Sequence, residues 1–295
     1  METFFDFGEI IKKDTEFVIF GIPWDSLTSI KGVESSKAPK RIREATYDIG
    51  LATELGIEIP KLKVCDKGDI EIDSKDISEN LKNIEDFIQK LYETNSSIIP
   101  VMIGGDHFCS YPVIRKVGNF LKEDKLGVLV FDAHLDFYDK WEENKYSHAT
   151  ISHRIFDLDF INNQNFLIVG TRDIDIPEQN LAKQNNLEFF NAYEFHNNIN
   201  EFSQRIINFF HNSKVEKLYI SIDIDVLDPS IAPGTGYAIP GGFSYRELWH
   251  ILRKLSIFFD IIGFDLVEVA PNLDLLNKIT CNTAAKIIIE LISFI

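Results

Sequence analysis

The chain contains 295 residues, 46 of them acidic and 30 basic, which gives a formal net charge of −16 at pH 7. Hydrophobic residues make up 45% of the chain, enough to bury a sizeable core, which disfavours a wholly disordered protein. The negative charge repels phosphate backbones and anionic lipids, which disfavours a general nucleic-acid or membrane-surface binder.

Short apolar runs alternate with amphipathic stretches along nearly the whole chain. In chain order, strands are predicted at 17–22, 62–65, 98–103, 127–131, 166–170, 218–222 and 261–264. Helices are predicted at 39–48, 77–92, 112–121, 203–210, 245–255 and from about 283. This alternation predicts an α/β fold with a parallel sheet that is covered on both faces. No linker or repeat divides the pattern, so residues 1–295 are expected to form a single domain.

The sequence also carries signals of its cellular compartment. No apolar run approaches the roughly 18 residues that a membrane-spanning helix needs. The N-terminus lacks the basic start and long apolar stretch of a signal peptide. Cys65, Cys109 and Cys281 are an odd number without paired spacing, which is typical of thiols in a reducing compartment. A cytoplasmic protein is therefore expected.

Polar residues of unusual types follow three of the predicted strands. These segments are Gly104-Gly105-Asp106-His107, Asp132-Ala133-His134-Leu135-Asp136 and Asp223-Ile224-Asp225. In parallel sheets, ligand sites lie beyond the carboxyl ends of the strands, so the three segments are expected to meet. Asp106 is expected to be a hydrogen-bond partner or turn residue rather than a ligand.

The spacing and chemistry of these residues predict a metal site. In an extended chain, residues two apart project to the same side, so each segment can converge if it stays extended. Four carboxylates and two imidazoles in one crevice would be costly without cations, because like charges raise each other's pKa. Two divalent cations would balance the four carboxylates. Oxygen ligands with some imidazole suit Mn²⁺, with Zn²⁺, Co²⁺ or Fe²⁺ also possible, and two such ions activate a bridging water for hydrolysis.

The three segments resemble the signatures of the ureohydrolase family, the arginases and agmatinases, and the resemblance covers nearly the whole chain. It implies a three-layer α/β/α sandwich on an eight-stranded parallel sheet, with a binuclear manganese centre. By the same resemblance, one ion would be surrounded by His107, Asp132, Asp136 and Asp223. The other would be surrounded by Asp132, His134, Asp223 and Asp225, with Asp132 and Asp223 bridging.

Two further site residues follow from this resemblance, and with Asp136 they make up the implied catalytic set. His148, in Tyr146-Ser147-His148-Ala149-Thr150, is similar to the family histidine that is proposed to pass protons to the leaving amine. Glu268, in Val267-Glu268-Val269-Ala270-Pro271, is similar to the glutamate that binds the guanidinium group. The implied substrate is a small cationic guanidino compound, and the implied assembly is a homo-oligomer, a trimer or a hexamer.

Loop motifs favour agmatinase, which releases putrescine and urea and so belongs to polyamine biosynthesis. Ala232-Pro233-Gly234-Thr235-Gly236 resembles the agmatinase branch, whereas Gly170-Thr171-Arg172-Asp173-Ile174-Asp175 looks more like arginase. Asp175 is expected either to receive a substrate amine or to cap the following helix. The segments 32–39 and 237–242 depart from the usual family pattern.

Several alternatives remain open at this point. Within the family, these are arginase, guanidinobutyrase and formimidoylglutamase. A catalytically silent oligomeric relative is disfavoured, because it has no need for an uncompensated carboxylate cluster. A binuclear-metal phosphoesterase is disfavoured because no basic or Gly-rich phosphate cradle lies beside the predicted ligands.

Overall fold

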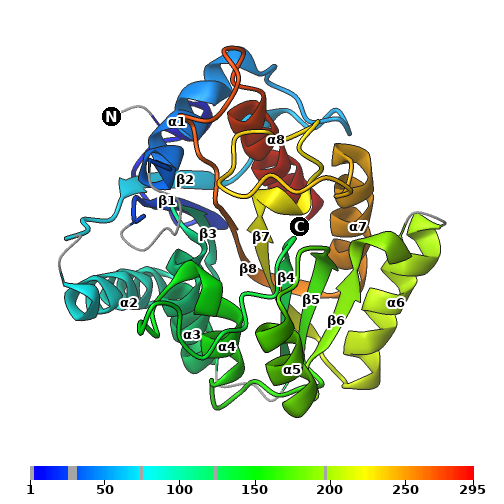
Figure 1. The fold of residues 1–295 in the computed structure, drawn as a ribbon. Coiled ribbons are helices and arrows are strands. Elements are labelled where there is room, and N and C mark those ends of the chain that lie inside the picture. Colours follow the sequence, from blue (N-terminus) through cyan, green and yellow to red (C-terminus); the bar gives the residue numbers. More distant parts are fainter. Residues whose placement is uncertain (1–2, 26–31, 74–75, 122–124, 196–197) are drawn as a thin grey trace.

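The computed structural model describes residues 3–25, 32–73, 76–121, 125–195 and 198–295. Eight parallel strands form one sheet in the order β2-β1-β3-β8-β7-β4-β5-β6 (Figure 1). Their bounds are β1 Phe17–Ile22, β2 Val64–Asp69, β3 Ile99–Gly104, β4 Leu126–Phe131, β5 Phe166–Thr171, β6 Glu188–Asn191, β7 Lys217–Asp223 and β8 Asp260–Val267.

Helices cover both faces of this sheet (Figure 1). One face carries α1 (Ala38–Ala45), α6 (Ile199–Asn212), α7 (Tyr245–Phe258) and α8 (Ile279–Phe294). The other carries α2 (Ile77–Thr94), α3 (Ser110–Leu121), α4 (Ile151–Phe156) and α5 (Ile176–Gln184). The α/β/α sandwich on an eight-stranded parallel sheet is thus confirmed. In the described parts of the chain, no helix has the length and apolarity that crossing a membrane would require.

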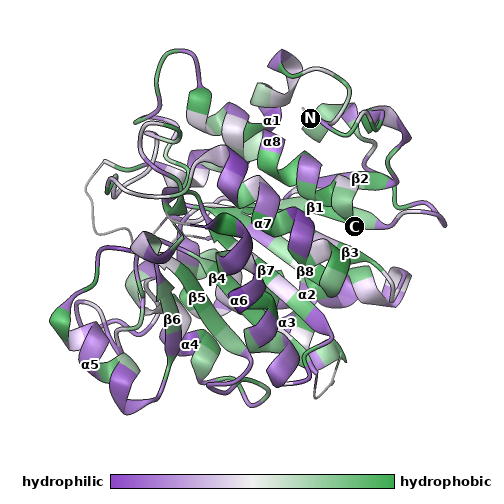
Figure 2. Ribbon diagram, turned by 90° about the vertical axis from the view of Figure 1, so that its right-hand side faces the viewer, coloured by the Kyte–Doolittle hydropathy of each residue, from purple (hydrophilic) through white to green (hydrophobic). Residues whose placement is uncertain are grey.

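The apolar strands are explained by burial on both sides. In β4, Val128 and Val130 belong to the core under α2–α5, whereas Leu129 and Phe131 belong to the core under α1 and α6–α8. The central strands are accordingly green along most of their length in Figure 2, while the helices carry both purple and green residues. A strand with two buried faces gives a continuous apolar run, which is why the central strands were predictable.

Seven strands were predicted, and each has a counterpart in the structure. β2 is shifted, since it starts at Val64 and continues through Asp66, Lys67 and Asp69 instead of covering 62–65. The short strand β6 was missed. Both β2 and β6 are edge strands with exposed positions, so the apolar pattern that marks the central strands is weaker in them.

The predicted helices are also present, with ends that differ by a few residues. α1 ends at Ala45 and the chain continues as a 3-10 turn to Asp48, and α8 begins earlier, at Ile279. Helices α4 and α5 were missed. α5 buries only Glu178 and Ala182, so it lacks the apolar stripe by which helices are recognised. All three cysteines are buried free thiols.

Candidate functional site

The candidate site lies at the carboxyl ends of central strands. His107 begins the 3-10 turn His107–Cys109 just after β3, Asp132 follows β4, and Asp223 ends β7. The backbone just before His107 packs closely against that of Trp24, because a Cβ atom at Gly105 would lie 2.0 Å from the carbonyl oxygen of Trp24. Only glycine lets the backbone pass this close, so the Gly-Gly pair turns the chain and aims His107 at the neighbouring strand ends.

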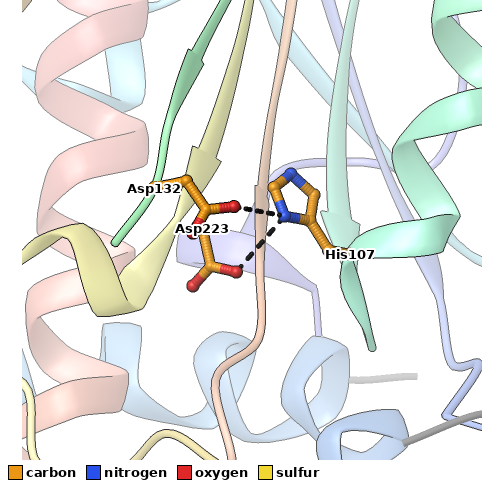
Figure 3. A group of neighbouring side chains, drawn as sticks. All are labelled: His107, Asp132 and Asp223. Atoms are coloured by element: carbon orange, nitrogen blue, oxygen red, sulfur yellow. Dashed lines mark ion pairs between the residues drawn. The ribbon is translucent and has the colours of Figure 1, made fainter. Parts of the chain in front are cut away.

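His107, Asp132 and Asp223 meet at one point (Figure 3). His107 Nδ1 lies 3.0 Å from Asp132 Oδ2, 3.3 Å from Asp223 Oδ2 and 3.4 Å from Asp136 Oδ2. All four side chains are buried. In Figure 3 both drawn carboxylates face the same imidazole nitrogen. This is the arrangement of ligands that could surround one cation.

A second group lies beside the first and shares Asp132 with it. His134 Nδ1 is 3.0 Å from Asp225 Oδ2 and 3.4 Å from Asp132 Oδ1. The two oxygens of Asp132 therefore face different histidines. All six predicted ligands come together, but Asp223 belongs only to the first group, so its role as a second bridge stays a prediction.

The predicted reason for this convergence was wrong. Asp225 does not continue an extended strand but lies in the 3-10 turn Ile224–Val226, where its backbone N–H donates to Asp223 Oδ1 over 2.9 Å. Asp136 has a φ of 48°, so the chain turns after His134 as well. Turns at the strand ends, rather than strand alternation, bring these side chains to one side.

The nitrogen and oxygen atoms of the cluster are suited to bind cations. His107 Nδ1 and Asp132 Oδ2 are buried and make no hydrogen bond within the described chain, although they lie 3.0 Å apart. Buried polar atoms without a partner are costly, and a cation bound between these two would satisfy both. Carboxylate oxygens and imidazole nitrogens without thiolate suit Mn²⁺ and similar divalent ions. The residues present therefore fit a pair of divalent cations that share Asp132.

The electrostatics of the cluster agree with this fit. Burial disfavours charged forms of His107 and His134, but the surrounding carboxylates outweigh it and raise the pKa of both imidazoles. Burial and the charge of Asp132 raise the pKa of Asp136 to about 7. Burial, with the charge of Asp225, also raises the pKa of Asp223. Without cations, the cluster balances its charge by holding protons.

A pocket of about 140 Å³ opens onto the cluster. Its wall is strongly acidic, and among the described lining residues there is no lysine or arginine. The acidic lining residues are Asp136, Asp173, Asp175, Glu178, Asp223, Asp225 and Glu268. Tyr138, Trp141 and Tyr237 supply aromatic surface, and His148 also lines the pocket. Such a wall attracts a cation and repels an anionic group.

Glu268 and His148 both lie in this pocket, as predicted. Glu268 follows β8, and its Oε1 accepts the backbone N–H of His107 over 2.8 Å. Burial, and then the charge of Asp106, raises the pKa of Glu268 to about 8. His148 is only 9% exposed, so it is not a surface residue. It begins a 3-10 turn that the Ser147 capping box stabilises.

Asp175 lies on the pocket wall, and the proposed helix cap is not observed. It occupies the N-cap position of α5, but its side chain accepts no capping hydrogen bond. Its Oδ2 instead accepts the hydroxyl proton of Tyr138 over 2.6 Å. The side chain is thus held at the pocket by an aromatic neighbour, in a place where it can receive a substrate amine.

Several pocket residues were missed by the sequence reasoning, among them Asp173, Glu178 and Trp141. Glu178 Oε1 accepts the backbone N–H of Phe137 over 2.8 Å, and burial, with the charge of Asp136, raises its pKa to about 8. Glu178 was not predicted as a site residue because the helix that carries it, α5, was itself not predicted. Of the unusual segments, 237–242 supplies Tyr237 to the wall, whereas in 32–39 the carbonyl of Gly32 binds the Asn272 amide.

Comparison with known proteins gives consistent matches over most of the chain. The model of the Arginase family matches residues 15–293. Arginase 1 of Arabidopsis thaliana is 36% identical over 265 residues, which are 86% of this chain and 74% of that protein. Agmatinase of Pyrococcus horikoshii is 30% identical over 281 residues, covering 95% of this chain and 92% of its own. The crystal structure of formimidoylglutamase from Bacillus subtilis is similar with a TM-score of 0.86 and 26% identity, covering 96% of this chain and 88% of its own.

Proposed function

The chain belongs to the arginase family, and from that premise we propose that it is an agmatinase, which hydrolyses agmatine to putrescine and urea with two Mn²⁺ ions. As a family member it is a hydrolase of C–N bonds in linear amidines, and the family depends on two metal ions. Family membership alone does not fix the substrate, because the relatives named above include an arginase, an agmatinase and a formimidoylglutamase.

The charge of the pocket wall is the observation that carries the proposal. Beyond the predicted ligands, Asp173, Asp175 and Glu178 also line the pocket, and we expect the substrate tail to lie among them. Arginine would bring its α-carboxylate against these groups, with no lysine or arginine among the described lining residues to pair with it. Agmatine has a terminal ammonium and no carboxylate, so its tail complements the same wall.

The proposed roles of the residues are those that the family resemblance implies, and the convergence of the side chains supports them. His107, Asp132, Asp136 and Asp223 would hold one ion, and Asp132, His134, Asp223 and Asp225 the other. When bound, the two ions supply a hydroxide nucleophile near neutral pH by lowering the pKa of a water.

The substrate would be oriented from both of its ends. Glu268 would accept hydrogen bonds from the planar guanidinium fork, a charge-assisted pairing that fixes the angle of the reacting carbon. Asp175, held by Tyr138, would receive the terminal ammonium. His148, on the pocket wall, would pass a proton to the amine as the C–N bond breaks.

We further propose that residues 1–295 act as one catalytic domain in a cytoplasmic homo-oligomer, a trimer or hexamer. The three buried free thiols support a reducing, intracellular setting. Sedimentation analysis of the purified protein would measure the oligomeric state directly, and a monomer at micromolar concentration would contradict this part.

The substrate is tested with a panel of guanidino compounds and added Mn²⁺. Agmatine, arginine, 4-guanidinobutyrate and N-formimidoylglutamate are incubated separately, and urea, formamide and amines are separated by chromatography. We expect equal amounts of putrescine and urea from agmatine, with kcat/KM roughly 100-fold or more above that for arginine. Faster urea release from arginine or 4-guanidinobutyrate, or formamide from N-formimidoylglutamate, would contradict the agmatinase assignment.

A further inference from the structure

Arg172 has no role in the mechanism proposed above, although its side chain makes several hydrogen bonds. It follows β5 and is half-buried, and its guanidinium donates hydrogen bonds to backbone carbonyl oxygens from separate segments. The accepting carbonyls, with their donor–acceptor distances, are Gly170 (3.3 Å), Asp225 (2.6 Å), Val226 (3.4 Å), Leu227 (3.1 Å) and Ile239 (2.8 Å).

Gly170 lies on β5 itself, and the other four carbonyls belong to two segments beside the second ligand group. Asp225 and Val226 lie in the 3-10 turn that presents the Asp225 carboxylate to His134, and Leu227 is the residue that follows this turn. Ile239 lies two residues after Tyr237, whose ring is 5.6 Å from the ring of His134. One rigid guanidinium therefore ties the ligand turn to the loop that carries the aromatic wall of the pocket.

The chemistry of arginine suits this task. Its planar fork has five N–H donors in fixed directions, and it stays charged in proteins. The Val226 carbonyl also accepts the backbone N–H of Phe243, but Arg172 is the donor to the carbonyls of Asp225 and Leu227, and buried acceptors without partners are costly. The fixed positive charge also lies near the carboxylates of Asp225, Asp132 and Asp228, which it stabilises.

We propose that Arg172 is a positioning residue that couples the ligand group Asp132–His134–Asp225 to the Tyr237 wall of the substrate pocket. The inference rests on the proposed function, in which this group holds one of the two ions. Arg172 holds the Asp225 carboxylate toward His134 and, with the same side chain, holds Tyr237 at the pocket. Loss of its fork should weaken one cation and the substrate together.

The first test uses Arg172→Lys, which keeps the charge but replaces the fork by a single ammonium. Mn²⁺ is titrated calorimetrically into metal-stripped wild type and variant. We expect one ion to bind as in wild type and the other about 10- to 100-fold more weakly. With Mn²⁺ at saturation, we also expect a higher KM for agmatine. Arg172→Gln, which removes the charge too, should change both quantities in the same direction and further.

Two matched controls separate coupling from a general loss of structure. Asp228→Ala frees the same loop at Gly241, whose N–H donates to Asp228 Oδ2 over 2.7 Å, but leaves the carbonyls of the ligand turn with Arg172. It should raise KM and leave both ions bound. Arg115→Lys alters an arginine that pairs with Glu85, between α2 and α3, and should change neither quantity.

Double variants show which ion Arg172 serves. In a His134→Asn background, adding Arg172→Lys should not weaken the remaining ion further, whereas in a His107→Asn background it should. Equal weakening of both ions, or wild-type affinity for both, would refute the coupling while leaving the proposed function standing if wild type still hydrolyses agmatine. Failure of the wild type to take up Mn²⁺ would overturn both proposals.

Discussion

Two pocket carboxylates, Asp136 and Glu268, have left-handed backbone conformations, with φ of 48° and 62°. For residues other than glycine this conformation costs about 1–2 kcal/mol. The backbone N–H of Glu268 donates to the carbonyl of Gly105 over 2.8 Å, and its side chain accepts from His107, so both ends of the residue are held. Strain maintained by such contacts is typical of sites where a side chain must point in an unusual direction.

The guanidinium-binding role of Glu268 is tested by its neutral variants. Glu268→Gln keeps an acceptor for the His107 N–H but loses the charge, so we expect kcat/KM to fall at least about 100-fold with two metal ions still bound. Glu268→Ala should lose as much activity. The exposed Glu188→Ala on β6 is the control and should behave as wild type. Unchanged kinetics in Glu268→Gln would refute the substrate role.

The shared position of Asp132 leads to a prediction about metal content. Asp132→Asn removes the negative charge that lies between the two ligand groups, so we expect fewer than two Mn²⁺ per chain by elemental analysis and a loss of most activity. Asp139→Asn removes an exposed carboxylate that pairs with Arg154, and should leave metal content unchanged. Two bound ions and full activity in Asp132→Asn would show that this residue does not bridge.

Among the elements, α1 is attached to the edge of the sheet by a buried ion pair. Arg43 on α1 binds both oxygens of Asp66 on β2, at 2.7 and 2.9 Å, and also contacts Asp69. Asp66 accepts the backbone N–H of Phe4 as well, so the N-terminal segment joins the same contact. The edge strand β2, whose apolar pattern is weak, is thus held to α1 by an ion pair.

Removing this attachment should destabilise the protein strongly. Arg43→Met leaves Asp66 buried without its cation, and we expect the free energy of unfolding to fall by about 3–5 kcal/mol in chemical denaturation. Arg41→Met on the same helix breaks only an exposed pair with Glu44, and should change it by less than about 1 kcal/mol. Similar losses in the two variants would mean that the buried pair is not what holds α1 to β2.

For the molecule as a whole, the site makes stability depend on pH. The pKa of Asp136 is raised to about 7 and those of Glu178 and Glu268 to about 8, in each case first by burial. The pKa values of His107 and His134 are raised too, by their carboxylate neighbours against the effect of burial. Between pH 5 and 8 the folded, metal-free protein therefore binds more protons than the unfolded chain.

The sign of the resulting pH dependence follows from linkage. A raised pKa contributes stability that is complete below the unfolded value and is lost as pH rises through the folded value. We expect the metal-stripped protein to unfold at lower denaturant concentration at pH 8 than at pH 5. Glu178→Gln, which keeps an acceptor for Phe137, should reduce this difference. Mn²⁺ binding should release protons and restore stability at pH 8. A metal-free protein that is more stable at pH 8 would contradict this account.

Much of the architecture could be read from the sequence because its signals are local or periodic. Strands buried on both faces are continuous apolar runs, as in β4, and the short polar segments after them mark the edge where ligands bind. The six predicted ligands were identified in this way, with the family resemblance assigning each to an ion. Edge strand β6 and helix α5 carried no such signal, because little of either is buried.

What only the tertiary structure decided is how turns and distant contacts aim the side chains. Asp225 reaches His134 from a 3-10 turn, Asp175 contacts Tyr138 across 37 positions of the chain, and Arg172 joins residues 225–227 to Ile239. These relations depend on backbone dihedrals and on packing between segments far apart in sequence, which no local pattern encodes. Residue types thus determined the chemistry that the site can perform, and the folded backbone determined which acidic groups remain to select the substrate.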